Sequence, residues 1–185
     1  MAERCPRDQG FIEAVPYSGT LTMKGWERID KLHESGPNSA FVFVAMSFAP
    51  EMSELYDEAI VPAVRLAGYE QIRVDRKEHA NSIDDEIIGG IRKSRFMIAD
   101  FTGQKAGVYF EAGMMHGLGR TVIWMCDDRE LAKVHFDLRQ RNFINWSSTE
   151  DARQRLYNRI VAIEGEGPNI QDINSSSSGV KNRLL

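Results

Sequence analysis

Apolar and polar residues alternate in blocks from residue 40 to about residue 164, and each block has the length of a buried strand or an amphipathic helix. The first block, AFVFVAMSF at residues 40–48, is a continuous apolar run that suits a strand buried on both faces. Further short apolar segments predict strands at residues 71–75, 96–101, 121–127 and 142–146.

The segments between these strands carry the spacing of helices. They lie at residues 53–69, 81–94, 107–119 and 148–165. The second of them begins with the capping residues Asn81 and Ser82 and ends with Arg92 and Lys93, which matches the helix dipole. Pro62 falls inside the first helix and predicts a kink there.

Strands that alternate with helices over short connections predict a parallel sheet with helices on both faces. Five strands suggest an α/β, flavodoxin/Rossmann-like, doubly wound fold with the strand order 2-1-3-4-5. Such sheets bind ligands beyond the carboxyl ends of their strands, near the switch point between strands 1 and 3. The segments expected at this edge are residues 45–50, 75–82 and 100–107, with a long connection at residues 126–141 as a candidate lid.

The two ends of the chain differ from this pattern, and we expect a domain over residues 40–166. Residues 167–185 are rich in Ser and Gly and predict a flexible tail. Residues 1–39 predict an extension with a short strand and one amphipathic helix that turns Trp26, Ile29 and Leu32 inward. This extension looks like the end of a winged-helix module, or is a helix packed on the side of the domain.

Composition narrows the class of protein further. A net charge of −4 argues against coating nucleic acid, and no apolar run approaches the length of a membrane span. Cys5 and Cys126 form neither a disulfide framework nor a CxxC pair, and the four histidines are scattered. We therefore expect a cytoplasmic protein with reduced thiols, no metal site and no cofactor.

Glu111 is the residue that the pattern does not explain. In a helix that starts near Gly107, Glu111 shares one stripe with Met114, Met115 and Leu118, which is the spacing of a face that packs on the core. A buried carboxylate is costly, so proteins neutralise it, pair it or use it. Because this helix follows the third strand, Glu111 is also expected at the ligand-binding edge.

The run FVFVAMSF, followed by SRFMIADFTGQKAGVYFEAGMMHGLGRTVIW, resembles the nucleoside 2-deoxyribosyltransferase-like superfamily over roughly residues 40–165. This superfamily includes deoxyribosyltransferases and nucleotide N-glycosidases. The strongest part is GVYFEAGMMHGLG, in which an aromatic-Glu-x-Gly motif opens a helix of small residues. The resemblance implies that Glu111 is the nucleophile, with Gly107 allowing the backbone close to the ligand.

The resemblance also implies an acidic residue on the helix before the third strand, where the aligned position is Ile87. Asp84, one turn earlier on the same face, is a candidate to replace it, and the alternative is a simple interaction with the helix dipole. Asp100, at the end of the third strand, is predicted either to bind sugar hydroxyls or to cap the turn that follows.

Several further residues are candidate substrate contacts. Lys105 stands where nucleotide-cleaving members hold a 5′-phosphate, and Ser47 and Phe48 follow the first strand at the same edge. The alternatives are a solvated lysine and a serine that belongs to a turn. Basic residues and a histidine cluster at the exit of the second strand, namely Arg73, Arg76 and His79. The candidate lid contains His135, Phe136, Asp137, Gln140 and Asn142. Related enzymes are oligomers that complete a site from the next chain, so a homo-oligomer is expected.

The function that these residues favour is an N-glycosidase that cleaves the base–sugar bond of a nucleoside or nucleotide, by hydrolysis or by transfer to another base. A carboxylate below the sugar stabilises the positive charge that develops at C1′, or bonds to that carbon. Cleavage of NAD, as in a defence effector, is one alternative. A non-catalytic nucleotide-sensing module is another, favoured by Ile87 at the position of the family's acid.

Overall fold

The computed structural model describes residues 12–15, 18–24, 39–74 and 83–170, and it divides the chain into the units Met1–Asn38 and Ser39–Leu185. In the first unit, β1 (Ile12–Val15) and β2 (Ser18–Leu21) form an antiparallel hairpin. The expected short strand is therefore present, and the sequence analysis missed its partner β1. The expected helix with Trp26, Ile29 and Leu32 lies outside the described residues.

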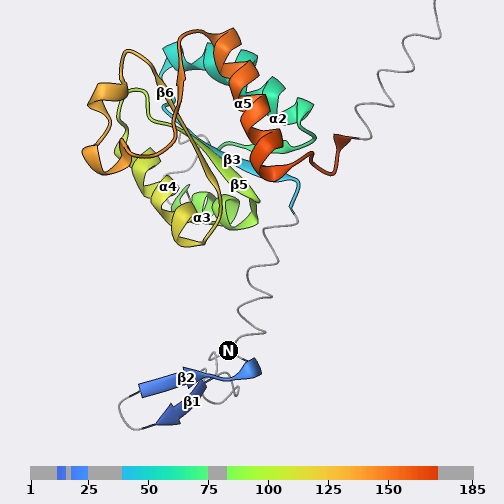
Figure 1. The fold of residues 1–185 in the computed structure, drawn as a ribbon, viewed down its shortest axis with the longest axis vertical. Coiled ribbons are helices and arrows are strands. Elements are labelled where there is room, and N and C mark those ends of the chain that lie inside the picture. The colour runs from blue at the N-terminus through green and yellow to red at the C-terminus, as the bar shows by residue number, and fades with distance from the viewer. Residues whose placement is uncertain (1–11, 16–17, 25–38, 75–82, 171–185) are drawn as a thin grey trace, which may run out of the picture. The chain divides into compact units, whose positions relative to one another are not determined.

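The second unit contains a five-stranded, all-parallel sheet with the order β4-β3-β5-β6-β7 (Figure 1). The strands are β3 (Phe41–Ala45), β4 (Glu70–Ile72), β5 (Phe96–Asp100), β6 (Val122–Asp127) and β7 (Ile144–Trp146). This is the predicted order 2-1-3-4-5, so the flavodoxin-like α/β fold is confirmed. The switch point lies between β3 and β5, where the chain begins to add strands on the other side of the first one.

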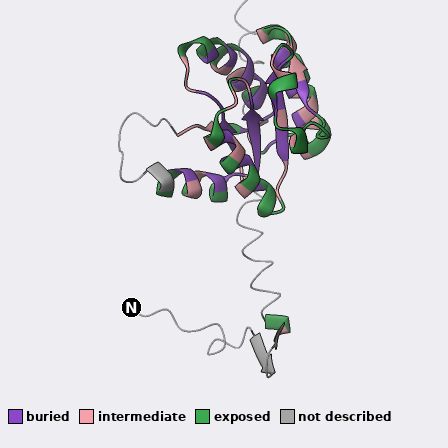
Figure 2. Cartoon of the chain, turned by 90° about the vertical axis from the view of Figure 1, so that its left-hand side faces the viewer, coloured by how far each residue is buried: buried purple, intermediate pink, exposed green. Residues whose placement is uncertain are grey.

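Helices cover both faces of this sheet, as predicted. The helical elements are η1 (Pro50–Met52), η2 (Leu55–Ile60), α2 (Val61–Leu66), α3 (Ile83–Lys93), α4 (Ala106–Gly117), η3 (Leu131–Lys133), η4 (Phe136–Leu138) and α5 (Thr149–Glu164). Figure 1 shows α2 and α5 on one face and α3 and α4 on the other. The buried residues lie along the strands and the inner sides of the helices (Figure 2).

Successive side chains along each strand point to opposite faces of the sheet, so the strands contribute to two hydrophobic cores. Val42 and Val44 of β3 pack in the core beneath α2 and α5, whereas Phe43 and Ala45 pack in the core beneath α3 and α4. All five residues of β5 are buried, since this central strand has helices on both sides. No helix among the described residues is both long enough and apolar enough to cross a bilayer.

Pro62, where the sequence predicts a kink, lies just after a change from a π-helix to an α-helix. The helix after η1 runs as a π-helix over η2 and becomes α-helical in α2, with Pro62 in the first turn of α2. Proline has no N–H to donate and its ring crowds the carbonyl four residues earlier, so the wider turn accommodates it.

The end of the domain reaches beyond the expected boundary at residue 166. Gly167 N–H donates to the carbonyl of Ala67 at 2.7 Å, and Asn169 N–H donates to that of Gly68 at 3.1 Å. Gly167 is buried. Residues up to Ile170 are thus attached to the helical layer, and the rest of the expected tail lies outside the described residues.

At the amino edge of the sheet, hydrogen bonds from one arginine side chain join two neighbouring elements, and we call this contact the Arg120 clamp. The guanidinium Nη1 of Arg120, between α4 and β6, donates to the carbonyls of Arg92 and Ser94 at 2.7 and 2.8 Å. These carbonyls lie in and just after the last turn of α3, where helix carbonyls have no partner within the helix. The turn entering β6 is therefore fixed to the neighbouring helix at the edge opposite the predicted site.

Candidate functional site

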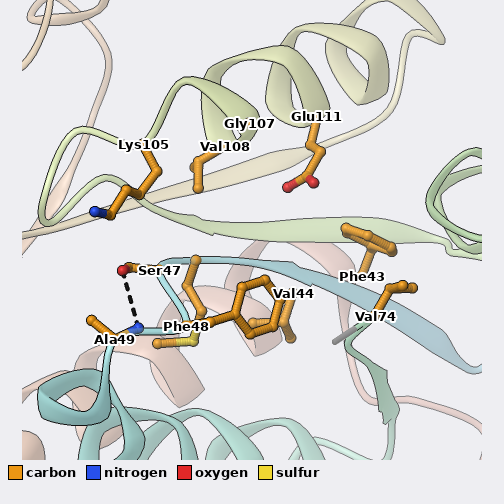
Figure 3. A pocket seen from close by; sticks show the side chains of 11 residues that line it. Phe43, Val44, Ser47, Phe48, Ala49, Val74, Lys105, Gly107, Val108 and Glu111 are labelled. Carbon is orange, nitrogen blue, oxygen red and sulfur yellow. Dashed lines mark hydrogen bonds between the residues drawn. The ribbon is translucent and has the colours of Figure 1, made fainter. Parts of the chain in front are cut away.

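A cavity of about 330 Å³ lies at the carboxyl end of β3, between this strand and α4 (Figure 3). Its walls are formed by Phe43, Val44, Met46, Ser47, Phe48, Ala49, Val74, Lys105, Gly107, Val108 and Glu111. This is the switch point of the sheet, where the sequence analysis placed the ligand. Its volume is at the lower end of the range of small-molecule sites, about 300–1,000 Å³.

Five of the predicted site residues come together in this cavity. Ser47 and Phe48 belong to the loop that leaves β3, and Lys105, Gly107 and Glu111 belong to α4 and the residue before it. Gly107 and Glu111 are four positions apart and therefore share one face of the helix. Because both segments follow adjacent parallel strands, the topology brings them to one edge.

Glu111 lies in the middle of the cavity wall. Glu111 is only 7% exposed, and Figure 3 shows its carboxylate directed from α4 toward the strands. The predicted stripe holds, since Met115 is fully buried and Met114 and Leu118 are partly buried. Burial of this kind strengthens the attraction between a carboxylate and a positive charge that appears near it.

One end of the cavity is polar. Lys105 is exposed, and its ammonium makes no hydrogen bond or ion pair with another described residue. Ser47 is 4% exposed, and its Oγ accepts a 3.3 Å hydrogen bond from Ala49 N–H, which leaves its hydroxyl hydrogen able to donate. An ammonium and a hydroxyl donor side by side are suited to an anionic oxygen.

The other end of the cavity is apolar and partly aromatic. Figure 3 shows Phe43 and Val74 beyond Glu111, on the side away from Lys105. Phe48 lies along the floor, and its ring is 4.6 Å from the guanidinium carbon of Arg73. The cavity thus runs from a cationic end, past a carboxylate, to an apolar end.

Arg73 supports this wall from behind. Its guanidinium carbon is also 4.3 Å from the ring centre of Tyr56, so it is stacked against two aromatic rings. Its Nε is buried without a hydrogen-bond partner among the described residues. Burial raises the pKa of the Tyr56 hydroxyl. Arg73 therefore acts here as a packed cation that fixes Phe48, and it is not among the residues that line the cavity.

Asp100 is fully buried and does not line this cavity. Its Oδ1 accepts from Thr102 N–H at 3.0 Å and its Oδ2 accepts from Trp146 Nε1 at 2.8 Å. Burial raises the pKa of this carboxyl group. Of the two interpretations of Asp100, the geometry matches the carboxylate that caps the turn after β5, rather than one that touches a sugar.

A second cavity of about 270 Å³ follows the same edge of the sheet toward β6 and β7. Its walls are formed by Ser47, Glu51, Met52, Thr102, Gly103, Lys105, Asp127, Arg129, Glu130 and Trp146. The sequence analysis did not predict it. Its charged residues are separated along the chain, so only the fold brings them together.

Most of the charges in the second cavity are already paired. Oδ1 of Asp127 accepts from Arg129 Nε at 2.9 Å, and this interaction lowers the pKa of Asp127. Glu130 accepts from Gly103 N–H at 2.8 Å and from Lys133 Nζ at 3.0 Å, and both hydrogen bonds lower its pKa. These carboxylates are ionised, rigid acceptors on the cavity wall.

Of the remaining predicted residues, those that the structure describes do not line the first cavity. His79 and the side chain of Asp84 lie outside what the structure describes. Ile87 is 5% exposed and packs in the core beneath α3 and α4. Asn142 lines neither cavity and accepts a 3.2 Å hydrogen bond from Arg159 Nη2 on α5.

The candidate lid contains two short helical turns and is exposed over most of its length, although Val134 between the turns is fully buried. His135 Nδ1 accepts from Asp137 N–H at 3.4 Å, and His135 N–H donates to Tyr109 Oη at 3.2 Å. Phe136 is 69% exposed. Asp137 and Gln140 also face solvent, and neither lines the two cavities. His116 on α4 is exposed, and its Nε2 lies 3.3 Å from Arg141 Nη2.

Sequence reasoning missed the apolar walls of the first cavity. Phe43, Val44 and Met46 belong to a run that reads as ordinary strand core, and Val74 is an isolated apolar residue beyond β4. No signal in the sequence distinguishes a strand residue that borders a cavity from one that is fully packed.

No group of three or more histidine, cysteine or acidic side chains among the described residues is arranged to hold a metal ion.

Neither models of known protein families nor curated protein sequences gave a match to this chain. The resemblance noted in the sequence therefore stays a hypothesis.

Proposed function

We propose that this protein is an N-glycosidase that cleaves the base–sugar bond of a nucleotide, with Glu111 as the nucleophile. The observation that carries the proposal is the order of groups along the first cavity: Lys105 and Ser47, then Glu111, then an apolar end. A nucleotide has the same order, with an anionic phosphate, a sugar and a flat, largely apolar base. In this orientation the sugar lies next to Glu111.

The proposed reaction has two steps. In the first, a carboxylate oxygen of Glu111 bonds to C1′ while the C1′–N bond breaks, and the electron pair leaves with the base, which takes up a proton. In the second, water or another base attacks C1′ and releases the carboxylate. Hydrolysis and transfer differ only in this acceptor. The apolar walls around Glu111 favour the step in which positive charge develops.

Chromatography of reaction mixtures tests the proposal. The protein is incubated with deoxynucleosides, nucleoside monophosphates and NAD in separate mixtures, and released base is measured. Glu111→Gln keeps the shape of the side chain and removes the nucleophile, so we expect it to abolish base release while nucleotide binding stays near normal. Glu58→Gln changes an exposed glutamate on η2 and is the matched control.

Base release by the Glu111→Gln variant at the wild-type rate would overturn the role of Glu111. Release from wild type alone would support the proposal and identify the substrate. A second base added to the mixture then separates a transferase, which forms a new nucleoside, from a hydrolase, which leaves free sugar.

A non-catalytic nucleotide-sensing module is the second candidate, and the burial of Ile87 favours it. A carboxylate expected at this position of α3 is replaced by an isoleucine that packs against the core. Under this alternative the same cavity binds nucleotide and controls a partner. Nucleotide binding by calorimetry, together with no base release during long incubation, would support it over the enzyme.

We also propose that the chain forms a homo-oligomer, with the candidate lid near a subunit interface. Phe110 on α4 and Phe136 in the lid are 65% and 69% exposed. The hydrogen bond between Tyr109 and His135 brings the segments that carry these rings together. Light scattering of the wild type and of Phe110→Ser/Phe136→Ser tests the proposal, and a wild-type mass equal to one chain would contradict it.

A further inference from the structure

We propose that the second cavity is a subsite for a group attached to the far side of the substrate's phosphate. The preferred substrate would then be a nucleoside diphosphate that carries a second, hydroxyl-bearing group, such as a dinucleotide or a nucleotide sugar. This inference rests on the proposed function, because the first cavity fixes where the first phosphate lies.

The two cavities share a wall, and the shared residues are Ser47 and Lys105. Glu111 and the apolar end lie on one side of them, and the ends of β6 and β7 lie on the other. A phosphate held by Ser47 and Lys105 would therefore stand at the junction. Any group esterified to it on the side away from the sugar would enter the second cavity.

The charges in the walls of the second cavity determine which attached groups can bind there. Its walls carry three carboxylates, from Glu51, Asp127 and Glu130, against two cations, from Lys105 and Arg129. A triphosphate tail would bring several further negative charges next to these carboxylates, which is unfavourable. One additional phosphate beside Arg129, followed by a neutral group, fits this balance better.

Fixed carboxylates are good acceptors for sugar hydroxyls. Glu130 is held on two sides by Gly103 N–H and Lys133, so its position is set before a ligand arrives. Glu51 is exposed on η1 and makes no hydrogen bond with another described residue. A ribose or hexose can donate its hydroxyl groups to both, whereas an apolar group would leave them unpaired.

Trp146 adds a planar surface to this cavity. Its indole is partly buried, and the hydrogen bond from Nε1 to Asp100 fixes the orientation of the ring. An immobilised indole is a favourable surface for a sugar face or a second base. Together the two cavities have room for a ligand larger than a single nucleotide.

Calorimetry on the inactive Glu111→Gln variant tests the subsite without interference from turnover. The probes are matched pairs with the same base: AMP against diadenosine diphosphate, and UMP against UDP-glucose, with ATP and UTP as the triphosphates. We expect the extended member of the pair with the accepted base to bind at least tenfold more tightly than its monophosphate. We also expect the triphosphate to bind less tightly than the extended ligand.

A second variant separates the subsite from the first cavity. Glu51→Ala/Arg129→Ala removes two exposed side chains, neither of which lines the first cavity. We expect it to abolish the advantage of the extended ligand and to leave monophosphate affinity within twofold.

Equal affinity for extended and monophosphate ligands would overturn the subsite, even where the monophosphate is bound and cleaved. An equal loss of affinity for both ligands in the double variant would also overturn it. If wild type and Glu111→Gln bind no nucleotide in these experiments and wild type releases no base, the proposed function fails and the subsite fails with it.

Discussion

The indole Nε1 of Trp146 donates a 2.8 Å hydrogen bond to Oδ2 of the fully buried Asp100, across 46 residues of sequence. The bond joins the carboxyl end of the central strand β5 to the end of the edge strand β7. With the bond from Thr102 N–H to Oδ1, it satisfies both oxygens of a carboxylate that burial would otherwise disfavour.

We predict that Asp100→Ala lowers the free energy of unfolding by about 2 kcal/mol or more, because it leaves two partly buried donors without an acceptor. Trp146→Phe should have a smaller effect, and the double variant should show coupling between the two sites. Urea unfolding measures these values, with Asp57→Ala, an exposed carboxylate on η2, as the control. Additive effects of the two changes would contradict the importance of this bond.

The same carboxyl group predicts a pH dependence of stability. Burial raises the pKa of Asp100 above 3.8, so the folded chain keeps a proton that the unfolded chain has already lost. The contribution of this group to stability is therefore present at low pH and falls as the pH rises from about 3.8 through the raised pKa. In Asp100→Asn this part of the pH dependence should disappear from urea titrations at a series of pH values.

Lys105 is predicted to distinguish nucleotides from nucleosides. Lys105→Met should lower kcat/KM for a nucleoside monophosphate about 10- to 100-fold, because it removes a charge-assisted hydrogen bond to phosphate. The value for the corresponding nucleoside should change little. Lys93→Met, at the end of α3 and outside both cavities, is the control. Equal losses on both substrates would show that Lys105 does not hold the phosphate.

Gly167 is predicted to tolerate no side chain. A Cβ atom there would lie 2.2 Å from the carbonyl oxygen of Gly68, which belongs to the backbone and has little room to move. Gly167→Ala should therefore lower the melting temperature by several degrees, since a loss of about 1 kcal/mol already shifts it by a few degrees. At Gly113, in α4, an added Cβ meets nothing within 4 Å, so Gly113→Ala should be neutral or slightly stabilising. Thermal unfolding of both variants compares the two sites directly.

Cys126 is predicted to be chemically silent in the folded protein. The side chain is fully buried in β6, and burial raises the pKa of its thiol to about 12. Only the thiolate reacts with disulfide reagents, so a Cys5→Ser variant should show no reactive thiol at pH 8. The same variant in denaturant should show one. Rapid labelling without denaturant would contradict the burial of this strand.

The sequence was sufficient to predict the sheet because each strand is an apolar run separated from the next by a helix of clear period. It also predicted which loops meet, since parallel strands bring their carboxyl ends to one edge. Glu111, Lys105 and Ser47 were found in this way. The fold class and the first cavity thus follow from patterns of local sequence and from topology.

What the sequence did not predict depends on contacts between distant segments. The hydrogen bond from Trp146 explains why Asp100 is turned inward, and no local pattern links these residues. The second cavity likewise combines Glu51 from η1, which follows β3, with Arg129 and Glu130 after β6. The partner strand β1 was missed because it precedes the region of regular alternation.

The hydrogen bonds from Arg120 to the end of α3 suggest where the protein can be attached to a solid support. The Arg120 clamp stabilises the edge of the sheet opposite both cavities, close to the exposed end of α4, where a side chain at Gly117 would meet nothing within 4 Å. With Cys126 buried, a Gly117→Cys change in the Cys5→Ser chain introduces a selectively reactive thiol at that end. A sensor chip coupled through this thiol would present every molecule with its cavities toward the solution.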